Sequence, residues 1–279
     1  MKKFGLTAVA AAAVLAACGE GNDNMSVEEV LSASGENMEE VDSYRADVTM
    51  TQLIGTGEAE LGDLEISMES TMEITQDPYH LYQNAVVSDP FAEEEQEIEM
   101  YHVEEGEYMN NVVGMDVSDA EWLFIPGDGL EEDLGQDMQM DPTEQADYLQ
   151  EVADDVVMNE TDDTYVLAVS GEDVDIMELM ESDLGEDVLS DFDDVGASEE
   201  LLEVDHFHME VVIDKETLYQ TDANLEMVIE IEEMGEQVSM EQDMAMTLYD
   251  FDEVGEITVP EEIVENAEEI DQEDMMMTP

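Results

Sequence analysis

Long stretches of the chain alternate apolar and polar residues with a period of two. In the first of them, Ala46, Val48 and Met50 alternate with Asp47 and Thr49. Successive side chains of a strand point to opposite faces of a sheet, so this pattern predicts antiparallel strands with one face in a core and the other in water. Alternating stretches or short apolar runs of strand length cover residues 44–50, 64–74, 79–87, 98–103, 108–113, 122–125, 165–170, 207–213, 225–231 and 238–248.

Helical spacing marks a few shorter segments. Ser26 and Glu29 have the spacing of a capping box and precede an apolar stripe, which predicts an opening helix. Pro142 begins a second predicted helix and Pro260 a short third one. Residues 174–192 have the pattern of one or two further acidic helices. The apolar stripe of the second helix is Tyr148, Leu149, Val152, Val156 and Val157.

The chain is extremely acidic. Its 279 residues carry 80 Asp and Glu against 4 Lys and Arg, a formal net charge of −76. Nucleic acid is excluded as a partner, because almost no cations are available to neutralise phosphates. Apolar residues make up 43% of the chain and follow structural periods, which favours a folded protein over a disordered acidic one. Since about 1 M salt screens charge repulsion beyond about 3 Å, the acidity indicates adaptation to a saline or alkaline exterior.

The first residues have the pattern of a secretory leader. Lys2 and Lys3 precede an apolar run too short to span a bilayer, and Leu15-Ala16-Ala17-Cys18 resembles the bacterial lipobox. We therefore expect residues 1–17 to be a signal peptide and Cys18, the only cysteine, to carry a covalent diacylglycerol. Residues 18–25 would then be a lipidated tether, 26–270 a single domain and 271–279 a flexible acidic tail. Such a protein is anchored to the outer face of the cytoplasmic membrane.

Several segments together carry a family resemblance. They are the lipobox, the Trp122 segment, Ile213-Asp214-Lys215-Glu216-Thr217 and Gly255-Glu256-Ile257-Thr258-Val259-Pro260. With the opening helix and the closing three-strand meander, they resemble LolA-like (LppX-LprAFG-like) lipoproteins, and among these uncharacterised surface lipoproteins of Gram-positive bacteria. The resemblance implies an α+β fold: a curved antiparallel sheet, an incomplete barrel, with helices packed on its concave face. It also implies a lipid or other hydrophobic ligand between the sheet and the helices.

The 23 methionines are the most numerous candidate binding residues. Many of them fall on the inward positions of predicted strands, where flexible thioether side chains suit a variable acyl chain. The alternative is that they only fill the core, and copper(I) binding is disfavoured because the positions are spread over several strands. The residues expected to line a cavity are Met68, Met72, Met227, Ile229, Met244 and Met246, with Trp122 near its mouth.

His206, His208 and Glu210 form the sharpest local group of possible metal ligands. Their spacing of two places them on one face of a strand, where imidazoles and a carboxylate can bind zinc or copper with a further ligand from elsewhere. The alternative is that they are solvated residues on the wet face. Acidic runs such as Glu93-Glu94-Glu95 fit weak divalent cation binding, but no dedicated calcium loop occurs.

Catalysis has little support in the sequence. Neither the Gly-x-Ser-x-Gly elbow nor the His-Glu-x-x-His zinc motif is present, and no phosphate-binding glycine loop occurs. We expect a protein that is not an enzyme and has no cofactor besides the lipid on Cys18. The leading hypothesis is a membrane-anchored binder of a hydrophobic ligand. The alternative is an acidic envelope interaction or cation-binding lipoprotein without a cavity.

Overall fold

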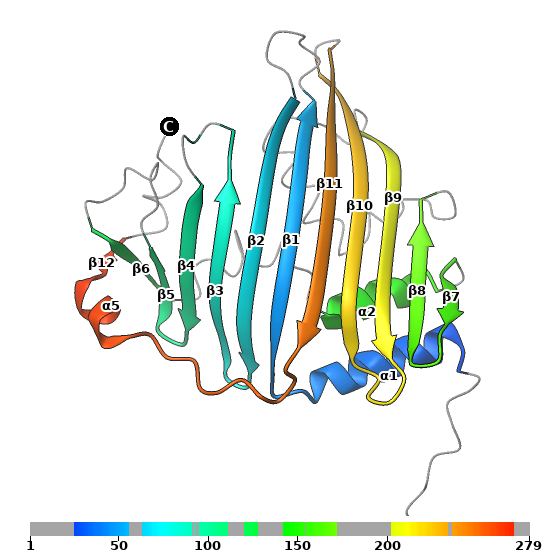
Figure 1. Cartoon of the computed structure of the whole chain (residues 1–279), viewed down its shortest axis with the longest axis horizontal. Coiled ribbons are helices and arrows are strands. Elements are labelled where there is room, and N and C mark those ends of the chain that lie inside the picture. Colours follow the sequence, from blue (N-terminus) through cyan, green and yellow to red (C-terminus); the bar gives the residue numbers. More distant parts are fainter. Residues whose placement is uncertain are drawn as a thin grey trace, which may run out of the picture.

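A broad antiparallel sheet dominates the structure (Figure 1). The computed structural model describes residues 25–55, 63–90, 92, 95–110, 120–127, 142–153, 155–171, 202–233 and 236–270. The strands are β1 (Ser43–Gly55), β2 (Asp63–Gln76), β3 (Tyr79–Ser88), β4 (Gln96–Val103), β5 (Gly106–Asn110), β6 (Trp122–Pro126), β7 (Val157–Glu160), β8 (Thr164–Ser170), β9 (Leu202–Asp214), β10 (Gln220–Glu233), β11 (Glu236–Tyr249) and β12 (Glu268–Glu269). The helices are α1 (Val27–Glu39), α2 (Pro142–Glu151) and α5 (Glu261–Asn266).

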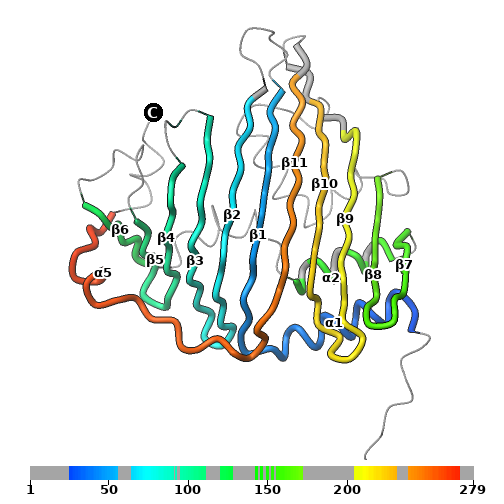
Figure 2. Tube along the Cα trace, in the orientation of Figure 1, coloured from blue at the N-terminus to red at the C-terminus, as the bar shows by residue number. Residues whose placement is uncertain are grey.

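The described strands form one twelve-stranded sheet in the order β12-β6-β5-β4-β3-β2-β1-β11-β10-β9-β8-β7. Neighbouring strands are antiparallel, except that β12 runs parallel to β6. β12 and β7 are the two ends of this order, so the sheet is open rather than a closed barrel. Figure 2 shows the N-terminal β1 beside the C-terminal β11 in the middle of the sheet. The structure confirms the predicted α+β class with an open, curved antiparallel sheet.

The opening helix begins where the sequence predicts it. The Glu29 amide donates to Ser26 Oγ at 3.3 Å, and the Ser26 amide donates to Glu29 Oε2 at 2.9 Å, which completes a capping box. One face of α1 is buried through Val30, Leu31 and Met38. The cap and the apolar stripe together fix where this helix starts and which side meets the sheet.

Helices α1 and α2 pack against each other and lie behind the sheet in Figure 1, toward the lower ends of β10, β9 and β8. They share a hydrophobic core with the sheet face that carries Ala46, Met72, Met209 and Met246, which we call the inner face. The opposite side is the outer face. Leu149 of α2 and Leu31 of α1 are almost fully buried in this core.

The outer face is covered by a helix only near β5 and β6 in the described part of the chain. Val103 and Tyr108 alternate with inward residues, and both pack against Ile263 of α5. On the inner side of the same strands, Leu123 and Ile125 pack against Ile270. Both faces are therefore apolar here, which accounts for the continuous apolar run of β6.

Most predicted elements are confirmed, with one correction. The opening helix, the short helix after Pro260 and the β9–β11 meander lie where the pattern places them. The second helix, however, ends at Glu151, and Val157 begins strand β7 instead of extending the helical stripe. Val157 is 55% exposed on this edge strand, so its apolar character does not report helix burial. The helices predicted over residues 174–192 lie outside the described residues.

Candidate functional site

A row of methionines crosses the inner face at the middle of the sheet. Met50 of β1 lies directly opposite Met68 of β2 on one side and Met244 of β11 on the other. Leu225 of β10 continues the row, and Met209 of β9 follows it. We call these five residues the methionine row. Register thus brings together thioethers that are up to 194 positions apart in the sequence, as Met50 and Met244 are.

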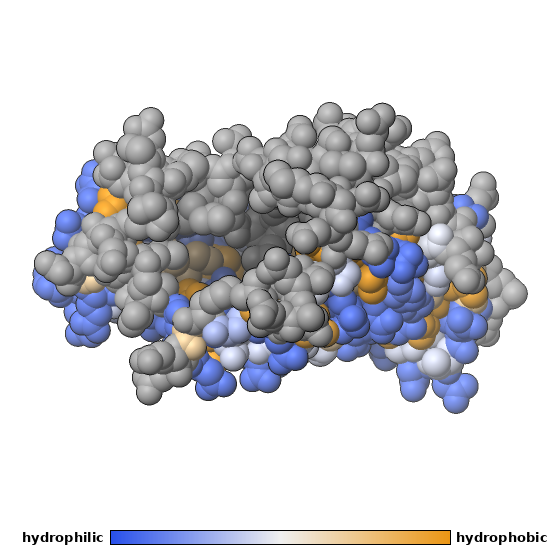
Figure 3. All heavy atoms as spheres, turned by 90° about the horizontal axis from the view of Figure 1, so that it is seen from above, coloured by the Kyte–Doolittle hydropathy of each residue, from blue (hydrophilic) through white to orange (hydrophobic). Residues whose placement is uncertain are grey.

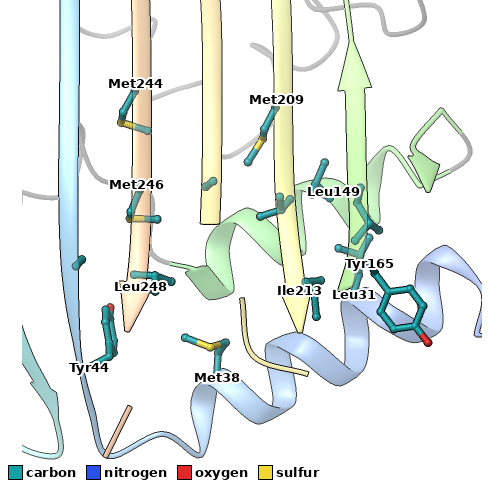
Figure 4. Packing of buried hydrophobic residues seen from close by; sticks show 14 of the residues in the cluster. Leu31, Met38, Tyr44, Leu149, Tyr165, Met209, Ile213, Met244, Met246 and Leu248 are labelled. Carbon is teal, nitrogen blue, oxygen red and sulfur yellow. The ribbon is translucent and has the colours of Figure 1, made fainter. Parts of the chain in front are cut away.

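Burial differs between positions of the inner face. Met72 and Met246, in the rows nearer α1 and α2, are buried at 1% and 6% exposure. Met68 and Met227 are only half-buried and pack against the edge of the same core. Figure 4 shows α1 and α2 near Leu248 and Ile213, whereas Met244 and Met209 lie farther along their strands.

Two glutamines interrupt the apolar inner face beside the methionine row. Gln52 of β1 lies opposite Gln242 of β11. The Gln52 Nε2 donates to Met240 Sδ at 3.1 Å, and the Gln242 Nε2 donates to Met50 Sδ at 3.9 Å. Thioether sulfur is a weak acceptor, so these contacts satisfy the amides only partly. An apolar surface with a few polar atoms at its centre is the usual character of a small-molecule binding site.

The structure gathers six of the seven predicted cavity residues on one surface. Met68, Met72, Met227, Ile229, Met244 and Met246 are all on the inner face. Trp122 is not with them. It lies on the outer face, where it packs beside Tyr101 and the α5 contacts, because the neighbouring Leu123 takes the inward position.

The predicted metal ligands do not converge. His206 and Glu210 are on the outer face of β9, as their spacing implies, but His206 Nε2 contacts Glu226 Oε2 at 3.5 Å. His208 Nδ1 instead shares a hydrogen bond with Ser170 Oγ at 3.0 Å. Within the described ranges, no three His, Cys, Asp or Glu side chains are arranged to hold a metal ion. His206 is exposed, as the solvated alternative expects, whereas His208 is half-buried.

Buried polar contacts that the sequence did not reveal help to position the inner face. Gln145 of α2 accepts a 2.6 Å hydrogen bond from Gln220 of β10, and both side chains are 1% exposed. His102 and Glu107 form a second buried pair at 3.2 Å across the β4–β5 hairpin. The sequence does hold one sign of Gln52: it is a polar residue two positions after Met50, where the alternation of the strand places side chains on the inner face.

Electrostatics outside the core is dominated by carboxylates. From above, the described surface is mostly hydrophilic, with small apolar groups between charged ones (Figure 3). The two basic side chains of the described chain both bind carboxylates: Arg45 pairs with Glu73 and Asp250, and Lys215 pairs with Glu160. An anionic ligand therefore meets a repulsive rim.

Cys18 lies outside the described residues. In the described part of the chain, no helix combines the length and the apolar character needed to cross a membrane.

An open antiparallel sheet with two helices on a methionine-rich inner face defines the class of this protein. The chain belongs to DUF6612, a family of unknown function, whose model matches residues 26–268. No curated protein has a matching sequence.

Three solved structures resemble the chain over most of its length. LprF from Mycobacterium bovis is 12% identical, with 84% of this chain and 95% of LprF covered and a TM-score of 0.35. A DUF1329 family protein from Desulfovibrio piger is 10% identical, with coverage of 84% and 96% and a TM-score of 0.27. A LolA superfamily protein from Nitrosomonas europaea is 10% identical, with coverage of 86% and 97% and a TM-score of 0.22. At TM-scores below 0.5, these likenesses carry no functional conclusion.

Proposed function

We propose that the protein binds an apolar ligand of the acyl-chain type on its inner face, and that a lipid on Cys18 holds it at the outer face of the cytoplasmic membrane. The observation that carries the binding proposal is the methionine row. Methionine side chains are unbranched and polarizable and adapt to guests of variable shape, and Met50, Met68 and Met244 are neighbours on adjacent strands.

The partial exposure of two inner-face methionines supports binding rather than simple core filling. Side chains that only fill a core are expected to be buried to a similar degree on every strand. Here Met72 and Met246 are packed into the helix-covered core, whereas Met68 and Met227 keep exposed surface. Each methylene that a ligand buries against such a surface contributes about 0.8 kcal/mol.

The polar atoms define where the head of a ligand sits. Gln52 and Gln242 offer amide groups at the centre of the face, next to Met50. Amides bind neutral carbonyl or hydroxyl groups without a charge, while the acidic surroundings repel an anionic head group. We therefore expect an uncharged or zwitterionic lipid rather than a fatty acid anion.

Displacement of a fluorescent apolar probe, together with native mass spectrometry against lipid extracts, tests the binding proposal. Met50→Gln and Met244→Gln are expected to weaken probe binding severalfold, because each places an amide in the row. Met50→Leu keeps volume and apolarity and is expected to bind nearly as well. Thr49→Gln, on the outer face of the same strand, is the matched control.

Two results would contradict binding on this face: no bound hydrophobe in protein refolded with lipid extract, or equal probe binding by Met50→Gln and Thr49→Gln. The anchor is tested separately by intact-mass analysis of protein from membranes. A mature chain that starts at Cys18 with added diacylglycerol is expected, and an unmodified cysteine behind an intact leader would refute the anchor.

A second function, acidic cation binding at the envelope, is favoured by one feature of the outer face. Glu226 of β10 lies directly opposite Asp243 of β11, and like charges in this position destabilise a sheet. Salt or divalent cations would relieve the repulsion. If this function holds, calcium raises the melting temperature of the native protein more than an equal ionic strength of NaCl does, and Glu226→Gln reduces the difference. An identical response to both salts would count against it.

A further inference from the structure

The outer face carries an aromatic surface that the inner-face function does not use. Tyr82 of β3 lies opposite Tyr101 of β4, with ring centroids 4.7 Å apart. The ring of Trp122 lies 6.1 Å from that of Tyr101. All three side chains are half-buried. We call these three residues the aromatic patch; it belongs to the strands labelled β3 to β6 at the left of Figure 1.

Helix α5 sets one boundary of the patch. Tyr108 lies opposite Tyr101 in the sheet, stacks on Phe124 at 4.6 Å and is buried against Ile263 of α5. The aromatic row thus continues under α5, where Tyr108 is buried by the helix. Tyr82, Tyr101 and Trp122 lie beside the buried Tyr108 and are only half-buried.

One carboxylate is fixed at the centre of the patch. The hydroxyls of Tyr82 and Tyr101 both donate to Glu99 Oε1, at 3.2 Å and 3.1 Å. Asn110 further positions this strand by accepting from the Glu99 amide at 2.9 Å. Glu99 Oε1 already accepts hydrogen bonds from two hydroxyls. It therefore attracts a ligand through its negative charge rather than by accepting a further hydrogen bond.

The surroundings add to this negative field. Burial raises the pKa of Tyr82, and the charges of Glu99, Glu73 and Glu97 raise it further. Burial and Glu99 likewise raise the pKa of Tyr101. The rings therefore stay neutral phenols in alkaline medium. Arg45, the basic side chain nearest in sheet order, is engaged by Glu73 and Asp250.

We propose that the aromatic patch binds a small soluble quaternary ammonium compound. Aromatic faces attract such cations through the ring quadrupole, and the strongly negative chain attracts them to the surface. A quaternary ammonium has no N–H groups to satisfy, which matches a carboxylate whose contacting oxygen is already occupied by two hydroxyls. Its methyl groups bury apolar surface against the three rings.

The chain supplies its own reporter for this site, because Trp122 is the only tryptophan. Full-length protein is titrated with choline at constant ionic strength, and tryptophan emission is followed. The neutral isostere 3,3-dimethyl-1-butanol is the chemical control. A saturable change with choline and none with the isostere is expected. An equal response to the isostere would overturn the proposal in favour of a neutral, sugar-like or purely apolar site.

Substitutions distinguish choline binding at the aromatic patch from non-specific attraction of a cation to the acidic chain. Tyr101→Leu removes one ring, and the expected weakening is about two- to fivefold, the size of one exposed cation–π contact. Tyr101→Phe keeps the ring and is expected to bind within twofold of the native protein. Glu99→Gln removes the central charge and weakens binding.

The matched control is Tyr249→Leu. Tyr249 is also on the outer face, and its hydroxyl also donates to a carboxylate, Asp47, at 3.1 Å, but it is outside the patch. Equal choline affinity in Tyr249→Leu and Tyr101→Leu would overturn the site. Binding to phosphatidylcholine vesicles without any response to free choline would assign the patch to membrane contact instead of a soluble ligand.

Discussion

The hydrogen bond between Gln145 and Gln220 gives the sharpest prediction for stability. It joins α2 to β10 inside the core, with a donor–acceptor distance of 2.6 Å and both side chains 1% exposed. Gln220→Met preserves length and removes the donor. The buried Gln145 carbonyl then loses this hydrogen bond without access to water.

The expected cost follows from burial. Removing one partner of a buried neutral hydrogen bond costs about 1–3 kcal/mol, and the added thioether recovers part of it through apolar burial. We therefore expect Gln220→Met to lower the free energy of unfolding by about 1–2 kcal/mol. For a domain of this size, the melting temperature falls by about 2–8 °C.

Urea unfolding measures the effect, with Gln242→Met as the matched control. Gln242 is also an inner-face glutamine, but it is half-buried and its contact is a 3.9 Å approach to sulfur. Its replacement is expected to change stability by less than about 0.5 kcal/mol. Equal effects of the two substitutions would refute the reasoning, as would a double-mutant cycle with Gln145→Met that shows no coupling.

Three further predictions concern the helix cap, a turn and the central ion pairs. Ser26→Ala removes the capping box of α1 and is expected to cost about 1 kcal/mol in urea unfolding. Burial alone would raise the pKa of Asp214, but hydrogen bonds from Thr217 and from the Glu216 amide outweigh burial and lower it. Because a lowered pKa stabilises the fold above the ordinary carboxyl pKa, Asp214→Ala should destabilise at neutral pH, and its difference from the native protein should vanish in acid-unfolding curves as the pH falls through the folded pKa. Arg45→Met breaks the pair with Glu73 and should lower the melting temperature in 0.1 M NaCl, with a smaller loss in 1 M NaCl; an unchanged loss would contradict a Coulombic role.

Alternation in the sequence was sufficient to predict the strands and the inward positions of their methionines. Met50, Met68 and Met244 face the core because each occupies the apolar phase of a long alternating stretch. The contact of Met50 with Met244 was not predictable, since it depends on β1 pairing with β11 across almost the whole chain. Periodicity specifies which face a residue takes, but not which strand lies beside it.

Trp122 shows where the pattern fails. The run from Trp122 to Ile125 is apolar at every position, so alternation gives no phase for it. The structure explains the run: α5 covers one face of β6 and Ile270 covers the other. Similarly, Val157 appeared to extend the stripe of the second helix although it lies on an edge strand. A single valine has the same apolar character whether it is buried under a helix or exposed on a strand.

The place of β1 in the middle of the sheet has a consequence for how the protein is made. Met50 meets Met244 across this seam, so the two halves of the proposed binding face come from opposite ends of the polypeptide. Such distant pairing makes folding slow, because a long loop must close before the contact forms. A nascent chain that has not yet been synthesised past residue 238 lacks the seam entirely. Capacity for the proposed ligand would therefore be acquired late, after β11 joins β1.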